Sequence, residues 1–142
     1  MTDTTVAASF PVLTLMVLLP LAGALVVGAV APLRRRARAL GLVFSVAELA
    51  LGVAAACEFD AGQGAAVQLA ETRPWIPLIG VSWALGATGL SLAMLLLATF
   101  LVPLVLLASW GEVPAHRQGL FTSLVLVLEA FVVVIFTARD LF

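Results

Sequence analysis

Long apolar stretches separated by short polar segments dominate the chain. Four of them lie at about residues 10–31, 40–57, 90–110 and 120–137. A helix of about 20 residues crosses the hydrocarbon core of a bilayer, and in lipid the backbone must satisfy its own hydrogen bonds. The pattern therefore predicts an all-α integral membrane fold with four transmembrane helices in a single domain, residues 1–142. A fifth apolar segment starts at about residue 140, which indicates the beginning of a fifth span.

The segment between the second and third stretches has a different pattern. Residues 67–69 and 81–83 are strand-like, and residues 77–80 between them have the proline and glycine of a turn. We therefore expect a small β-hairpin on the outer face of the membrane.

Composition supports the membrane assignment. Hydrophobic residues make up 63% of the chain and charged residues 11%. A water-soluble enzyme contains more charged residues, and a disordered chain contains fewer hydrophobic ones. The seven basic residues do not spread into a stripe that could follow phosphates, so no nucleic-acid partner is expected. The one cysteine, Cys57, makes neither an internal disulfide nor a metal cluster.

Arginine sets the expected orientation. Four arginines lie in the connection between the first two stretches, namely Arg34, Arg35, Arg36 and Arg38. By the positive-inside rule this connection is cytoplasmic. The N-terminus and the hairpin are then outside, on the periplasmic side, and residues 111–118 are cytoplasmic. The tryptophans at the ends of the stretches are expected to anchor the chain at the membrane interfaces: Trp75, Trp83 and Trp110.

Two glutamates near the middle of the spans are the candidate functional residues. Glu48 lies in the second stretch and Glu129 in the fourth. A charged side chain at that depth costs about 2.5–3.5 kcal/mol or more, so each must face protein or water. Either they belong to a hydrated proton path, or they are protonated and hydrogen-bond across a helix interface.

The residues around Glu48 favour an interface. Gly41, Ser45, Glu48 and Gly52 share one helix face, and small residues there allow another helix to approach closely. Glu129 has apolar neighbours at helical spacing.

Other polar or irregular positions have weaker claims. Pro20 and Pro103 lie inside spans, where each frees the carbonyl one turn back and more often shapes packing than builds a site. His116 lies in the second cytoplasmic connection, where an exposed histidine usually has no role. No catalytic, nucleotide-binding or metal-ligand motif is present, and no residues suit a haem or an iron–sulfur cluster.

A set of spaced motifs carries a family resemblance. The chain contains RPWIPLIGVSW at residues 73–83, GLSL at 89–92, SW at 109–110, LEA at 128–130 and DLF at 140–142. In this order they resemble the N-terminal part of the M subunit (mitochondrial chain 4) of proton-pumping NADH:quinone oxidoreductase, respiratory complex I. The family usually has an acidic residue just before GLSL, where this chain has Thr88.

The resemblance implies a function for the complete subunit. It implies an antiporter-like fold of about fourteen spans in a bacterial inner membrane. The complete subunit, within its complex, would couple quinone reduction to proton pumping. NADH, FMN, iron–sulfur clusters and quinone would be bound by other subunits, with no cofactor on this chain. The family's principal proton-path glutamate and lysines would fall beyond Phe142, so this part would serve mainly as scaffold. Glu129 matches the glutamate of the LEA segment, which implies a supporting role, whereas Glu48 has no counterpart.

Two alternatives stay open at this point. The chain could belong to the homologous subunit of a multisubunit cation/proton antiporter or membrane-bound hydrogenase, or it could be a freestanding four-helix structural membrane protein. In each case the partners are the lipid bilayer and other membrane proteins, with no soluble small-molecule substrate.

Overall fold

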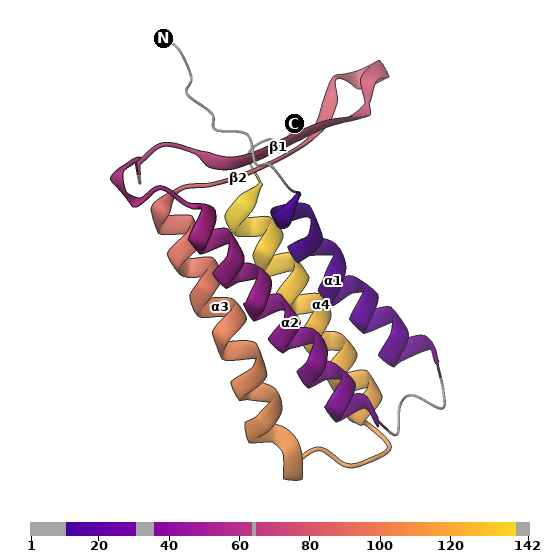
Figure 1. The fold of residues 1–142 in the computed structure, drawn as a ribbon. Helices are drawn as coiled ribbons and strands as arrows, with labels where there is room; N and C mark the ends of the chain where they lie inside the picture. Colours follow the sequence, from indigo (N-terminus) through magenta and orange to yellow (C-terminus); the bar gives the residue numbers. More distant parts are fainter. Residues whose placement is uncertain (1–10, 31–35, 64, 139–142) are drawn as a thin grey trace.

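The computed structural model describes residues 11–30, 36–63 and 65–138. Four long helices run side by side, with a two-stranded hairpin across one end of the bundle (Figure 1). The helices are α1 (Val12–Ala29), α2 (Ala37–Glu58), α3 (Gly89–Ala108) and α4 (Gln118–Thr137). Each starts or ends within three residues of the predicted span, and each is long and apolar enough to cross a membrane. The predicted fifth span from about residue 140 lies outside the described residues.

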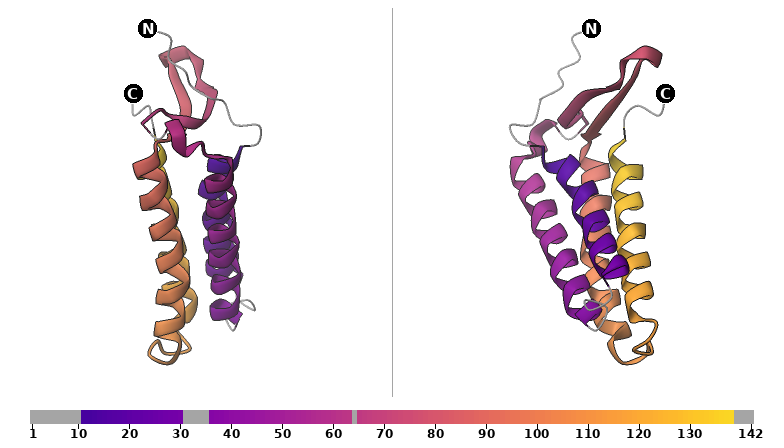
Figure 2. Two further views of the ribbon diagram at one scale, coloured as in Figure 1. Left: turned by 60° about the vertical axis from the view of Figure 1, so that its left-hand side comes forward. Right: turned by 90° about the vertical axis from the view of Figure 1, so that its right-hand side faces the viewer.

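The helices alternate in direction along the chain. The helices α1 and α3 run away from the hairpin, and α2 and α4 run toward it (Figure 1). Every pair of helices except α1 and α3 is in substantial contact, with α1 packed most extensively on α4 and α2 on α3. The views in Figure 2 show the hairpin crossing the same end of all four helices. As a result α2 and α4 are parallel neighbours, an arrangement that decides which of their residues meet.

The predicted hairpin is confirmed and is longer than its sequence signal. Strand β1 (Gln68–Ile76) pairs antiparallel with β2 (Val81–Ala87), with Arg73 opposite Trp83. A single 3₁₀ turn at Pro77–Ile79 joins the strands and ends at Gly80, whose φ of 71° is in the left-handed region that glycine adopts without strain. A further bridge from Leu85 to Ala138 connects the hairpin to the end of α4.

The start of α2 and the connection between α3 and α4 lie together at the end of the bundle opposite the hairpin. One Arg38 guanidinium nitrogen donates to the Val113 carbonyl at 3.2 Å, and the guanidinium carbon lies 5.8 Å from the centre of the Trp110 ring. Gln118 also donates to the Val113 carbonyl, at 3.3 Å. The start of α2 and the start of α4 are therefore at the same end of the bundle, as the predicted topology requires.

The outward faces of the helices are apolar. Large side chains such as Leu25, Val43, Leu97 and Leu128 are at least half exposed. A lipid environment suits such surfaces, since lipid tails are as apolar as leucine. Together with the four span-length helices, this makes the chain a multi-pass membrane protein.

Candidate functional site: two buried carboxyl groups

The predicted small-residue face of α2 is buried along its whole length. Gly41, Ser45, Glu48 and Gly52 are all buried, and Glu48 is 0% exposed. A Cβ added to Gly52 would lie 3.3 Å from the Thr99 hydroxyl oxygen and 3.4 Å from the Met16 methyl carbon. The face is therefore an interface with both α3 and α1, as the small residues predicted.

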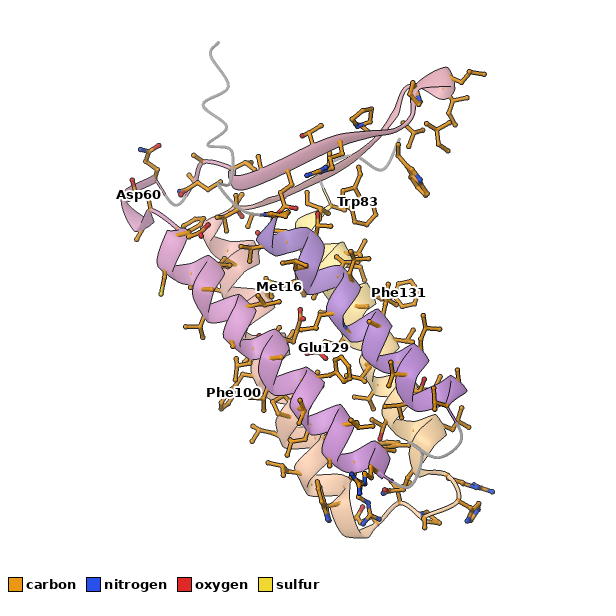
Figure 3. All side chains as sticks on the ribbon, turned by 45° about the vertical axis from the view of Figure 1, so that its right-hand side comes forward. Met16, Asp60, Trp83, Phe100, Glu129 and Phe131 are labelled. Atoms are coloured by element: carbon orange, nitrogen blue, oxygen red, sulfur yellow. The ribbon has the colours of Figure 1, made fainter. Side chains whose placement is uncertain are left out.

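The helix α4 presents a buried face with the same spacing. Thr122, Leu126, Glu129 and Val133 follow one another at intervals of four, three and four residues, which is also the spacing of the α2 face. Glu129 is 2% exposed, and its side chain lies midway along the bundle between the helices (Figure 3).

One close contact sets the register between the two faces. A Cβ built on Gly41 would lie 2.3 Å from the Thr122 methyl carbon, so the glycine allows α2 and α4 to approach there. The two helices are parallel, and Glu48 and Glu129 are each seven residues further along. Seven residues are almost two helical turns, which brings both glutamates back to the same face at the same level.

Neither carboxyl group has a hydrogen-bond partner among the described residues. All four side-chain oxygens of Glu48 and Glu129 are buried and unpaired. Burying a polar group without a partner costs free energy, and burying an unpaired charge costs far more. Such groups in a native interior call for an explanation, commonly a functional role or ordered water.

The two in-span prolines lie near this level of the bundle. Pro20 and Pro103 are buried in α1 and α3, which both continue through them. A proline has no N–H to donate to the carbonyl four residues before it. Those carbonyls belong to Met16 and Thr99, whose side chains approach Gly52 one turn from Glu48. The prolines thus leave the Met16 and Thr99 carbonyls without their helical N–H donors.

Glu129 also borders a cavity between α3 and α4. The cavity has a volume of about 140 Å³ and an almost wholly apolar lining. Besides Glu129, its walls come from seven side chains: Ala98, Leu101, Val102, Val105, Val125, Leu128 and Val132. Leu101, Val105 and Leu128 are each more than 40% exposed, so the cavity opens on the lipid-facing side of the bundle. Glu129 is therefore positioned between the bundle interior and a surface that further helices could cover.

The other sequence candidates do not join this site. His116 is exposed in the connection before α4, and Cys57 is exposed near the end of α2. No group of His, Cys, Asp and Glu in the described part of the chain could hold a metal ion.

A polar cluster at the hairpin end was not foreseen. Glu71 of β1 accepts the Leu13 and Thr14 N–H groups at 2.7 and 3.0 Å and also binds the Thr14 hydroxyl. Trp83, expected only as an interfacial anchor, donates its indole N–H to the Thr14 hydroxyl oxygen at 3.2 Å. The sequence does not predict this contact of Glu71, because its partners are more than fifty residues away along the chain.

Thr88 replaces the acidic residue that the resemblance leads us to expect before GLSL. Its hydroxyl accepts the Ser91 N–H at 3.3 Å, while the Ser91 hydroxyl accepts the Thr88 N–H at 2.8 Å. This reciprocal capping box starts α3. The departure thus keeps a helix-capping side chain at the position.

Comparison with known protein families places the chain. Residues 68–135, which run from the start of β1 through most of α4, match the family model described as NADH-ubiquinone oxidoreductase chain 4, amino terminus. The chain belongs to the chain 4 (subunit M) family of NADH:quinone oxidoreductases. This confirms the resemblance carried by the motifs between residues 73 and 130.

Individual relatives extend the similarity to the first two helices. NAD(P)H-quinone oxidoreductase chain 4 of Prochlorococcus marinus is 31% identical over 138 residues, covering 96% of this chain and 24% of the relative. NADH-quinone oxidoreductase subunit M of Mycobacterium tuberculosis is 39% identical over 103 residues, covering 72% and 18%. F(420)H(2) dehydrogenase subunit M of Methanosarcina mazei is 34% identical over 130 residues, covering 92% and 26%. Nearly all of this chain aligns with these relatives, but the chain spans only about a quarter of their length.

Proposed function

We propose that the chain forms the N-terminal portion of a proton-translocating membrane subunit of an NADH:quinone oxidoreductase. In the assembled enzyme, quinone reduction elsewhere in the complex drives protonation changes along buried polar groups of the membrane subunits. The four helices described here serve mainly as scaffold, and the buried carboxyl groups support the proton path.

The observation that carries this proposal is the burial of Glu129 without a partner in a chain of this family. Its carboxyl group is 2% exposed and makes no hydrogen bond to the described residues. Intramembrane ionisable groups are costly to keep and commonly mark ion or proton pathways. From Glu129 the proton path would continue through the adjoining cavity between α3 and α4, toward helices that pack there in the complete subunit. Glu48 joins Glu129 as the second candidate for the path.

The surroundings of the subunit follow from the same proposal. The Arg36 and Arg38 end of the bundle faces the cytoplasm of a bacterial cell, and the hairpin end faces the periplasm. The partners are lipid and other membrane subunits of the complex. NADH, FMN, iron–sulfur clusters and quinone are bound by other subunits, because the chain carries no ligand set for them.

One relative suggests a different electron donor for the enzyme. The Methanosarcina mazei protein is named as a subunit of an F(420)H(2) dehydrogenase, and it aligns with 92% of this chain. The membrane part would then perform the same proton transfer, while the enzyme oxidises F(420)H(2) in place of NADH. Substrate-dependent quinone reduction by purified complex, with each donor supplied in turn, separates the two.

The test of the proposed function is Glu129→Gln in the complete subunit assembled in its complex. This change removes the exchangeable carboxyl proton and nearly preserves the shape of the side chain. We expect proton pumping per quinone reduced to fall several-fold, while the complex assembles at its normal size. Glu58→Gln, at the exposed end of α2, is the matched control and should leave pumping unchanged. Unchanged pumping in Glu129→Gln would reduce the residue to a structural role.

A further inference from the structure

The parallel packing of α2 and α4 joins two glutamates that the sequence treats as separate candidates. The Gly41–Thr122 contact sets the register, and the matching four-three-four faces bring Glu48 and Glu129 to one level. All four of their side-chain oxygens are buried and have no hydrogen-bond partner among the described residues.

No other titratable side chain of the described residues lies in this part of the bundle. The helices α1 and α3, which pack against the pair, contain no titratable residue between their first and last positions. On α4, Glu129 is the only one. On α2 the others are Arg38, Cys57 and Glu58, which are nine or ten residues from Glu48 and therefore about 14–15 Å away along the helix axis. Among the described residues, the two glutamates thus have only each other as ionisable partners.

Two carboxyl groups in such a position have a preferred arrangement. Two carboxylates would repel each other in an interior of low dielectric. Two neutral acids could form only a neutral hydrogen bond, because neither group would be a charged acceptor. One acid and one carboxylate form a charge-assisted O–H···O⁻ hydrogen bond, which is stronger than a neutral one and satisfies both groups.

We propose that Glu48 and Glu129 form a single site that binds one shared proton. Loading adds a proton to the carboxylate partner, and release returns the pair to its single-proton form, so no bond other than O–H is made or broken. The carbonyls of Met16 and Thr99, freed by Pro20 and Pro103, provide acceptors nearby for water that would carry the proton. This inference deepens the proposed function and rests on it for the route by which the proton arrives.

The site differs from two independent carriers in how it titrates. Strongly interacting acids lose their protons in two separate steps that belong to the pair. Removal of either partner should replace the two steps by one step of intermediate position. The magnitude expected for such coupling is at least about tenfold in proton affinity, or about one pH unit.

Infrared spectroscopy of the assembled complex measures this directly. The carbonyl band of protonated carboxyl groups is recorded against pH for the wild type, Glu48→Gln and Glu129→Gln, and each variant's spectrum is subtracted from that of the wild type. We expect the remaining glutamate in each variant to titrate at least about tenfold away from its wild-type steps. Ser45→Ala is the matched control, because Ser45 shares the α2 face and its hydroxyl bonds only its own helix at the Leu42 carbonyl.

The outcomes separate this inference from the proposed function. If the remaining glutamate titrates as in the wild type, the shared-proton site is wrong even where Glu129→Gln lowers pumping. If the titration is coupled and pumping is unchanged, the site stands and the proposed role of Glu129 in pumping fails. Reciprocal coupling, with the same fold-change in Glu48→Gln and in Glu129→Gln, is the result that the shared site requires.

Discussion

The Glu71 carboxylate holds Thr14 by both its backbone N–H and its hydroxyl. One of its oxygens accepts the Thr14 N–H at 3.0 Å and binds the hydroxyl, and the other accepts the neighbouring Leu13 N–H at 2.7 Å. The first N–H groups of a helix have no partner within the helix, and they favour a negative charge. A residue of the hairpin thus caps a helix more than fifty positions earlier in the chain, and this fixes the hairpin against the end of the bundle.

The first prediction concerns this cap. We expect Glu71→Ala to destabilise the start of α1 by about 1–2 kcal/mol, because two N–H groups and a hydroxyl lose their acceptor. Hydrogen exchange at the Leu13 and Thr14 amides should accelerate by roughly five- to thirtyfold. Ala substitution of exposed Glu58 should leave both amides protected. Equal protection in Glu71→Ala would show that the cap contributes no stability.

The second prediction concerns the close approach of α2 and α4. A methyl group at position 41 would collide with the Thr122 methyl carbon at 2.3 Å, so Gly41→Ala should destabilise the bundle by about 1–3 kcal/mol. The double variant Gly41→Ala/Thr122→Ala should recover much of this loss, since it removes the colliding methyl. Resistance of the complete subunit to denaturant measures both effects.

Gly111 provides the control for that pair. A Cβ at Gly111 would meet nothing within 4 Å, so Gly111→Ala should leave resistance to denaturant nearly unchanged. A Thr122→Ala change that fails to rescue Gly41→Ala would mean that the two positions are not in contact.

The third prediction concerns the link between α4 and α1. The Ser123 hydroxyl donates to the Ala24 carbonyl at 2.8 Å, across 99 positions of sequence. We expect Ser123→Ala to cost about 0.5–1.5 kcal/mol, the usual net value of one hydrogen bond. A double-mutant comparison with Glu71→Ala should be additive, since Thr14 and Ala24 are about 15 Å apart along α1. Strong non-additivity would indicate that α1 docks as one cooperative unit.

The fourth prediction concerns the hairpin turn. Gly80 has a positive φ of 71° with open space around its α-carbon, so the backbone conformation alone opposes a side chain there. We expect Gly80→Ala to cost about 1–2 kcal/mol, and Gly80→Asn to cost less, because asparagine tolerates the left-handed region. Hydrogen exchange of the strand amides measures the difference. Equal exchange in all three proteins would contradict the turn geometry.

The sequence predicts well those features that depend on local pattern. Length and hydropathy place the four spans within three residues, because the bilayer imposes one helix length on each. The turn residues before Gly80 predict the hairpin, and the small residues around Glu48 predict a buried helix face. Each of these requires only the chemistry of neighbouring residues.

The sequence does not predict the features that depend on which helices are in contact. No local pattern shows that α2 packs parallel to α4, so the facing of Glu48 and Glu129 could not be predicted from their positions. The contact of Glu71 with Thr14 and the bond from Trp83 to the same hydroxyl are long-range consequences of the hairpin's position. In each case the missing information was tertiary packing.

A disulfide between positions 41 and 122 would show that Glu48 and Glu129 lie at the same level of the bundle. A Cβ at position 41 would lie 3.6 Å from the Thr122 Cβ, which is within the range for a disulfide. In a Cys57→Ala background we predict that Gly41→Cys/Thr122→Cys forms an internal disulfide on mild oxidation. Gly52→Cys/Thr122→Cys, three turns out of register, should stay reduced. A disulfide in the second pair and none in the first would place the two carboxyl groups at different levels and contradict the account.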